Sequence, residues 1–145
     1  MDKVFWNYGA KGAEISAAIA AVGTFLTGLL GGFDWMIGAL LWAMGLDIIL
    51  GVLCAAKNKS LDSQVMLWGG INKVLVLLFV GFGVVLDHAV GLQQPYIRTA
   101  IICFYLGREG LSALENSAKL GVPWPEFVKT MLAQLKEKGN EGENK

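Results

Sequence analysis

Long uncharged apolar stretches alternate with short polar segments along most of the chain. Nineteen consecutive residues, 15–33, carry no charge, and a helix of that length nearly crosses the roughly 30 Å hydrocarbon layer of a bilayer. A second stretch, residues 35–56, is apolar except for Asp47. Because only a few residues separate the two stretches, they are predicted to form a tight helical hairpin.

A polar connector, residues 57–64, follows and cannot lie exposed in lipid. A third apolar helix is predicted at about residues 70–90, with Lys73 near its start. A fourth, at residues 95–114, has a short uncharged core because charges interrupt it, namely Arg98, Arg108 and Glu109. It can span a bilayer if the two arginines extend toward opposite interfaces, or if its polar side chains face other protein.

The end of the chain changes character after the fourth helix. Pro123 and Pro125 stop that helix, a short amphipathic segment follows, and six of the last ten residues are charged. Residues 1–118 are therefore predicted to form a transmembrane domain, and residues 119–145 a cytoplasmic segment with a solvated tail. The expected fold is an all-α integral membrane protein with about four spans, a three-span version remaining open.

Lysine and arginine positions predict the orientation of the chain in the membrane. With four spans and the amino terminus inside, every lysine and arginine except Arg98 falls on the cytoplasmic side. A three-span version without the fourth helix places Lys57 and Lys59 outside. Both termini are therefore expected in the cytoplasm. Lys3 and Lys11 before the first stretch also suit a cleaved signal peptide, but a second span follows directly, where a secreted protein would have a polar mature domain.

Composition supports a membrane protein and excludes other classes. Apolar residues make up 54% of the chain and charged residues 17%, against roughly 25% charged residues in soluble domains. Twelve basic and twelve acidic residues balance, which argues against a nucleic-acid binder. Cys54 and Cys103 both lie in apolar stretches, which argues against a disulfide-stapled secreted domain.

Small residues recur where helices would touch. In each of the first two stretches they repeat every four positions, and such ridges allow close helix approach. Asp47 lies on the ridge of the second stretch and is expected to face protein. The predicted helix-packing positions are Ser16, Ala20, Thr24, Gly28, Gly32, Ala43, Gly51 and Ala55.

Ionisable residues at membrane depth need partners, because each costs about 2.5 to 3.5 kcal/mol to insert. Lys73 is the candidate partner of Asp47, either as a packing ion pair or as part of a pore or trigger. In the fourth helix, five polar residues share one face: Arg98, Tyr105, Glu109, Ser112 and Asn116. That face would line a pore or subunit interface. Alternatively, this is an amphipathic helix leaving the membrane, with Glu109 and Glu115 solvated.

Catalytic chemistry finds little support in the sequence. His88 is the single histidine, and it lies at a predicted span exit. The sequence has no cysteine–histidine cluster with zinc spacing, no phosphate-binding glycine loop and no nucleophile elbow. No enzyme activity, catalytic residue, cofactor or metal is therefore predicted.

Several segments resemble a known family. They are Leu46 to Gly51, Lys57 to Ser63, Lys73, Gly107 to Asn116 and Leu120 to Pro125. Together they are similar to the toxin-secretion and phage-lysis holins of Gram-positive bacteria and their phages. The resemblance covers most of the chain from the second stretch to the tail.

The resemblance implies a homo-oligomer in the bacterial cytoplasmic membrane that opens lesions for an endolysin or a large toxin. The cargo need not bind directly, and an antiholin is a further partner that the resemblance allows. By similarity, Asp47, Gly51, Lys73, Glu109, Ser112, Glu115 and Asn116 are candidate functional positions, and the charge pattern adds Arg98 and Arg108.

Two other functions remain open from the residues. A small oligomeric transporter or ion channel could use Glu14 and Asp47 as a proton-coupled site. A membrane anchor could recruit a soluble partner through its short tail.

Overall fold

The computed structural model describes residues 2–131, 133 and 134, with side chains described from Gly12 onward. Four α-helices follow one another: α1 (Asp2–Leu29), α2 (Trp35–Lys57), α3 (Ser63–Ala89) and α4 (Tyr96–Leu120). Further helical turns begin at Glu126, and the described residues contain no strand. The predicted all-α class is confirmed.

Polar and glycine residues define the helix ends. The Asp34 carboxylate accepts a hydrogen bond from Ile37 N at 2.9 Å and caps α2, and Asp62 caps α3 by accepting from Gln64 N at 2.7 Å. Gly121 ends α4 with φ of 98°, a left-handed conformation that favours glycine.

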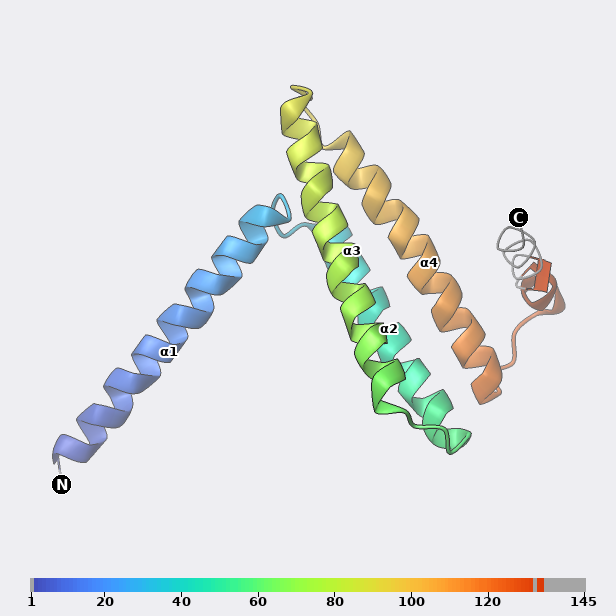
Figure 1. The fold of residues 1–145 in the computed structure, drawn as a ribbon, viewed down its shortest axis with the longest axis horizontal. Coiled ribbons are helices and arrows are strands. Elements are labelled where there is room, and N and C mark those ends of the chain that lie inside the picture. The colour runs from blue at the N-terminus through green and yellow to red at the C-terminus, as the bar shows by residue number, and fades with distance from the viewer. Residues whose placement is uncertain (1, 132, 135–145) are drawn as a thin grey trace.

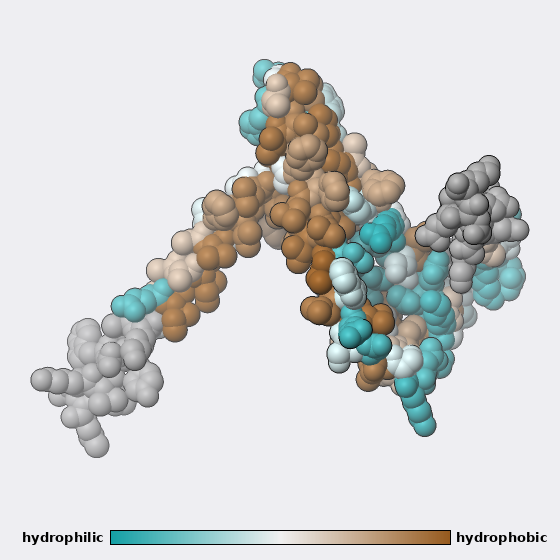
Figure 2. Space-filling view, in the orientation of Figure 1, coloured by the Kyte–Doolittle hydropathy of each residue, from teal (hydrophilic) through white to brown (hydrophobic). Residues whose placement is uncertain are grey.

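The helices α2, α3 and α4 form a bundle in which α4 packs against both of the others (Figure 1). All three contribute to its core, which contains Ile37, Leu40, Met44, Val76, Val80 and Ile102. Figure 2 shows apolar residues over α1 and much of α3, while polar residues gather around the lower ends of α2 and α4 in this view.

In contrast, α1 leaves the bundle and contributes no buried residue from Gly12 to Leu29 (Figure 1). The predicted hairpin is therefore wrong in its packing: the turn is short, but α1 does not lie along α2. Ser16, Ala20, Thr24 and Gly28, predicted to pack, are all exposed. The physical reason is that no described side chain of α1 forms an ion pair with the bundle. Lipid also surrounds an apolar helix surface as favourably as protein does.

Within the described part of the chain, three helices are long and apolar enough to cross a membrane: Gly12–Leu29, Trp35–Lys57 and Ser63–Ala89. The fourth predicted stretch is helical but is not among them, since charged residues lower its hydropathy. The chain is thus an all-α membrane protein with three candidate spans, and the fourth span stays a prediction.

Candidate functional site: two buried polar clusters

The first polar cluster lies between all three bundle helices. Lys73 of α3 forms ion pairs with Asp47 of α2, with 2.7 Å between Nζ and Oδ2, and with Glu109 of α4. Asn116 of α4 donates from Nδ2 to Asp47 Oδ1 at 3.2 Å. The exposed fractions of the side chains are 15% for Lys73, 16% for Asp47 and 4% for Glu109. One ammonium group therefore holds a carboxylate from each neighbouring helix, and we call these four residues the Lys73 cluster.

Small residues of α2 let α4 approach the cluster. A Cβ added at Gly51 would lie 3.8 Å from Asn116 Nδ2. One turn further on, the buried Cys54 donates from Sγ to the carbonyl of Asn116 at 3.1 Å. The small face of α2 thus meets α4, so Asp47 faces protein as the sequence predicts. Two other predicted packing residues, Ala43 and Ala55, are partly buried on the same helix.

Two cavities border the Lys73 cluster. One of about 140 Å³ is lined by Asp47, Lys73, Arg108, Glu109 and Ser112 together with two α3 residues. A larger one, of about 310 Å³, lies between α2 and α3 and also reaches Ser112 and Asn116. Both exceed the volume of a water molecule, so the cluster borders spaces that water can enter.

The second polar cluster surrounds Arg98, at the other end of α4. This side chain is only 2% exposed. Its Nε donates to the carbonyl of Leu30 at 2.6 Å, one terminal nitrogen donates to the carbonyl of Gly32 at 3.2 Å, and the other pairs with Asp34 at 2.6 Å. We call these contacts the Arg98 clamp, because they hold the α1–α2 turn against the bundle.

The turn is seated closely in the clamp. Gly31 has φ of 76°, and an added Cβ would lie 2.8 Å from Val84 of α3 and 3.2 Å from Arg98 Cδ. Asp87 stabilises the same region from α3, because its carboxylate accepts from the backbone N–H groups of Ile97 and Arg98 at 2.8 and 2.9 Å. It satisfies donors at the start of α4, where Pro95 supplies no side-chain cap.

The clamp also acts on the ionisation of Asp34. The hydrogen bond from Arg98 lowers the pKa of this carboxyl below its ordinary value of 3.8, against a smaller opposing effect of burial, and the N–H of Ile37 lowers it further. The clamp therefore favours the ionised form of Asp34.

The structure decides between the alternatives left open for α4. Arg98 faces other protein, because the α1–α2 turn accepts its hydrogen bonds and its ion pair. Glu109 is not solvated, since it is buried against Lys73. Of the remaining predicted residues, Arg108 is exposed, while Ser112 and Glu115 are partly buried.

Three contacts were not predicted from the sequence. Asp34 stands directly before α2, and an acid in that position is a capping signal. Asp87 lies within α3 and binds the first N–H groups of α4 across the turn, which no local sequence signal indicates. The third is Lys57 at the end of α2, which donates to the carbonyls of Lys119 and Leu120 at 3.0 and 3.4 Å. Trp124 similarly folds back on α4 by donating to the hydroxyl of Ser117 at 2.8 Å.

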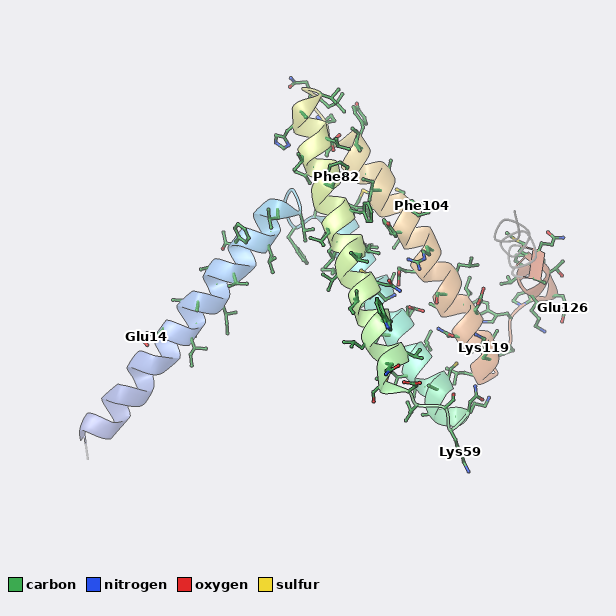
Figure 3. The ribbon with its side chains drawn as sticks, viewed as in Figure 1. Glu14, Lys59, Phe82, Phe104, Lys119 and Glu126 are labelled. Atoms are coloured by element: carbon green, nitrogen blue, oxygen red, sulfur yellow. The ribbon has the colours of Figure 1, made fainter. Side chains whose placement is uncertain are left out.

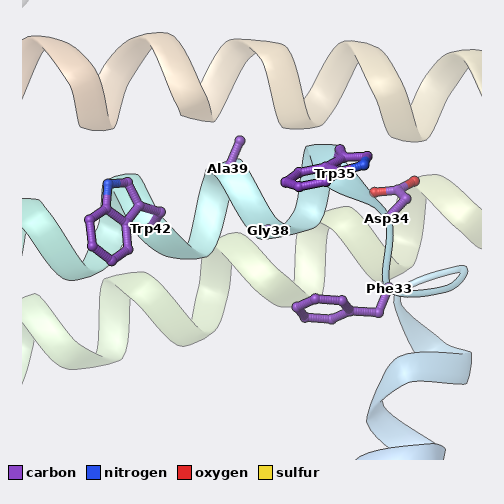
Figure 4. A pocket seen from close by; sticks show the side chains of 6 residues that line it. All are labelled: Phe33, Asp34, Trp35, Gly38, Ala39 and Trp42. Carbon is purple, nitrogen blue, oxygen red and sulfur yellow. The ribbon is translucent and has the colours of Figure 1, made fainter.

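An apolar hollow of about 600 Å³ lies outside the bundle near the clamp (Figure 4). Trp35 and Trp42 border it and are 90% and 77% exposed, as lipid-facing aromatic residues are. Among the described residues, no group of three or more His, Cys, Asp or Glu residues could hold a metal ion.

Three apolar helices and charged groups turned inward define an all-α membrane protein whose bundle is organised by buried ion pairs. The sequence model of the bacteriophage holin family matches residues 24–137, and the chain belongs to this family. The resemblance found in its sequence is thereby confirmed.

Relatives agree with this assignment. The chain is 39% identical over 126 residues to an uncharacterized protein of Clostridium perfringens, covering 87% of this chain and 93% of that protein. It is also 39% identical over 124 residues to an uncharacterized 14.9 kDa protein of Clostridium perfringens, covering 86% and 94%. A probable holin of Bacillus phage phi105 is 36% identical over 83 residues, covering 57% and 61%. No solved structure matches.

Proposed function

We propose that this chain acts as a holin, which oligomerises in the bacterial cytoplasmic membrane and opens lesions that release an endolysin during host lysis. A large toxin is the alternative cargo. The observation that carries the proposal is the Lys73 cluster, where three charges from three helices are held inside the bundle. Such groups are costly in lipid and are retained where function needs them.

The cluster suits a switch between a closed and an open bundle. In the closed bundle, Glu109 and Asn116 turn the polar face of α4 toward α2 and α3. Separating α4 from its neighbours would bring these groups to water, and several copies opened in this way would surround an aqueous lesion. Moving one charge through the membrane potential is worth about 2.3 kcal/mol per 100 mV, so loss of the potential can bias the switch.

We further propose that α4 is a fourth span. It is tied to α2 at both ends, through Arg98 with Asp34 and through Lys57 with the last carbonyls of α4. A helix that accompanies a membrane span along its length occupies the same layer. The charges of α4 that lower its hydropathy are largely turned inward, as buried Arg98 and Glu109 illustrate.

Four spans place both termini in the cytoplasm under the positive-inside rule. Residues 1–118 then form the transmembrane domain and residues 119–145 the cytoplasmic segment. The predicted tail lies mostly outside the described residues.

The test is induced expression in a bacterial host, alone and with an endolysin that lacks a secretion signal, while culture density and viability are followed. Sudden killing, endolysin-dependent lysis and their advancement by an energy poison are expected. Continued growth with the protein present in the membrane would overturn the proposal and favour a transporter or anchor.

The Lys73 cluster is tested with the variant Glu109→Gln in the same assay. It replaces the α3–α4 ion pair by a neutral hydrogen bond, so lysis is expected earlier than in the parent. Glu126→Gln is the matched control, because Glu126 is 84% exposed and pairs with Lys129 on the surface. An unchanged lysis time for Glu109→Gln would place the switch elsewhere.

A further inference from the structure

One face of α1 carries an acid and a row of small residues. Glu14, Ala17, Ala21, Thr24 and Gly28 follow at spacings of three, four, three and four, which places them on one side of the helix. All five are exposed, and Glu14 lies far from the bundle (Figure 3). Among the side chains described from Gly12 onward, Glu14 has no ion-pair partner.

The outer face of α4 carries a base, three small residues and Phe104. Ala100, Cys103, Phe104, Gly107 and Arg108 recur at helical spacing, and all are exposed. An added Cβ at Gly107 would have no neighbour within 4 Å. Arg108 lines the cavity beside the Lys73 cluster, but it forms no ion pair with any described residue.

Glu14 and Arg108 lie on the same side of the clamp. Arg98 bonds the carbonyl of Leu30, which places the end of α1 level with the start of α4. From there Arg108 is ten residues along α4, about 15 Å, and Glu14 is sixteen residues back along α1, about 24 Å. The two distances differ by about 9 Å, and the long Arg108 side chain can cover part of that difference.

We propose that α1 of one copy packs on the outer face of α4 of a second copy, where Glu14 of the first pairs with Arg108 of the second. The inference rests on the proposed oligomeric function and names the surfaces that build the oligomer. The partner copy completes the charged site, because Arg108 stands beside two carboxylates and one ammonium group that are already paired with one another.

Geometry favours a second copy over the same chain. The α1–α2 turn is held by the Arg98 side chain, which points into the bundle. The face with Ala100 and Gly107 lies on the opposite side of α4, so α1 would have to pass around α2 or α3 to reach it in its own chain.

The outer faces of α2 and α3 are less suited to α1. They expose bulky side chains, among them Trp42, Ile49, Leu78 and Phe82, which suit lipid contact. The α4 face exposes Phe104 as well, but Ala100, Cys103 and Gly107 beside it allow the close approach on which helix association in membranes depends.

A disulfide experiment tests the contact with native Cys103. Thr24 lies about 9 Å below Leu30, and Cys103 about 8 Å below Arg98. One tagged copy carries Thr24→Cys with Cys103→Ala, the other retains Cys103, and both carry Cys54→Ser to remove the buried thiol. A disulfide that joins the two tags in membranes under a mild oxidant is expected.

Leu26→Cys in place of Thr24→Cys is the matched control, since Leu26 lies at a similar depth on the opposite face of α1 and is 50% exposed. Its yield is expected to be at least about tenfold lower. Equal yields from positions 24 and 26, or no disulfide from position 24 in a protein that reaches the membrane, would overturn the proposal.

A charge exchange tests the ion pair. Glu14→Lys and Arg108→Glu are each expected to reduce the Thr24–Cys103 disulfide by about tenfold, and the double variant to restore it. Failure of the double variant to recover would refute the pair, because the disulfide alone reports proximity and leaves the charges untested.

The disulfide is measured independently of lysis, so failures of the two proposals differ. A disulfide in cells that keep growing supports the interface and refutes the holin. Endolysin-dependent lysis without the disulfide supports the holin and refutes this interface.

Discussion

Helix α1, which we call the arm, and the bundle of α2, α3 and α4 have similar apolar surfaces but differ in how much of each helix is buried. No residue of α1 from Gly12 onward is buried, whereas α2 and α3 bury part of each span. The bundle helices differ from α1 in carrying charges that find partners on one another, as Lys73 shows with its two carboxylates. Apolar patterning selects helices for the membrane, and paired polar groups select which of them associate within one chain.

The variant Lys73→Met is expected to have the largest effect on the difference between arm and bundle. It leaves Asp47 and Glu109 buried without their cation, which is expected to destabilise the bundle by about 3–5 kcal/mol. Loss of helicity during detergent denaturation, followed by circular dichroism, measures the effect. Lys59→Met is the control, because Lys59 is exposed in the α2–α3 connector (Figure 3). Similar stability of the two variants would mean that the ion pairs do not organise the bundle.

A glycine-to-alanine substitution is expected to change stability in opposite directions in the arm and in the bundle. In Gly83→Ala the added Cβ would lie 2.8 Å from Ile101 and 3.0 Å from the Arg98 backbone, a clash costing about 1–3 kcal/mol. In Gly23→Ala it would meet nothing within 4 Å, and helix propensity favours alanine by up to about 1 kcal/mol. The same denaturation series compares them, and a loss at position 23 as large as that at 83 would show that α1 is packed in the monomer.

The smallest expected effect is the titration of Asp34 at the junction of arm and bundle. Because Arg98 lowers the pKa of this carboxyl, its contribution to stability is complete above its ordinary pKa of 3.8 and is lost as the pH falls through the lower folded value. Carboxyl carbon NMR in micelles should show a midpoint below 3.8, returning toward 3.8 in Arg98→Gln. A midpoint that is the same in both proteins would show that the clamp is absent in solution.

Helical periodicity predicted one pair of the Lys73 cluster, because it shows which residues share a helix face. The four-residue repeat placed Asp47 on the small face of α2, and Lys73 on the antiparallel neighbour was its candidate partner. Asp47 and Lys73 are indeed paired. Glu109 and Asn116 were placed on one face of α4, and the fold turns that face inward. The functional roles of these residues stay predictions.

The Arg98 clamp could not be predicted, because most of its acceptors are not side chains. Its acceptors at Leu30 and Gly32 are backbone carbonyls, which carry no sequence signature. The sequence left open whether Arg98 extends to an interface or faces other protein, and only the fold shows that the α1–α2 turn binds it. The sequence also does not indicate that α1 points away from the bundle. Its row of small residues is suited to a neighbour in the same chain and equally to one in another chain.

The hydrogen bonds that join the ends of α2 and α4 affect which residues can change in evolution. Lys57 donates to the main-chain carbonyls of Lys119 and Leu120, which every amino acid possesses. Residues 119 and 120 can therefore diverge among descendants without losing the acceptors, while replacement of Lys57 removes the donor. Mutational tolerance at this junction should be asymmetric, with one constrained position on α2 facing two permissive ones on α4.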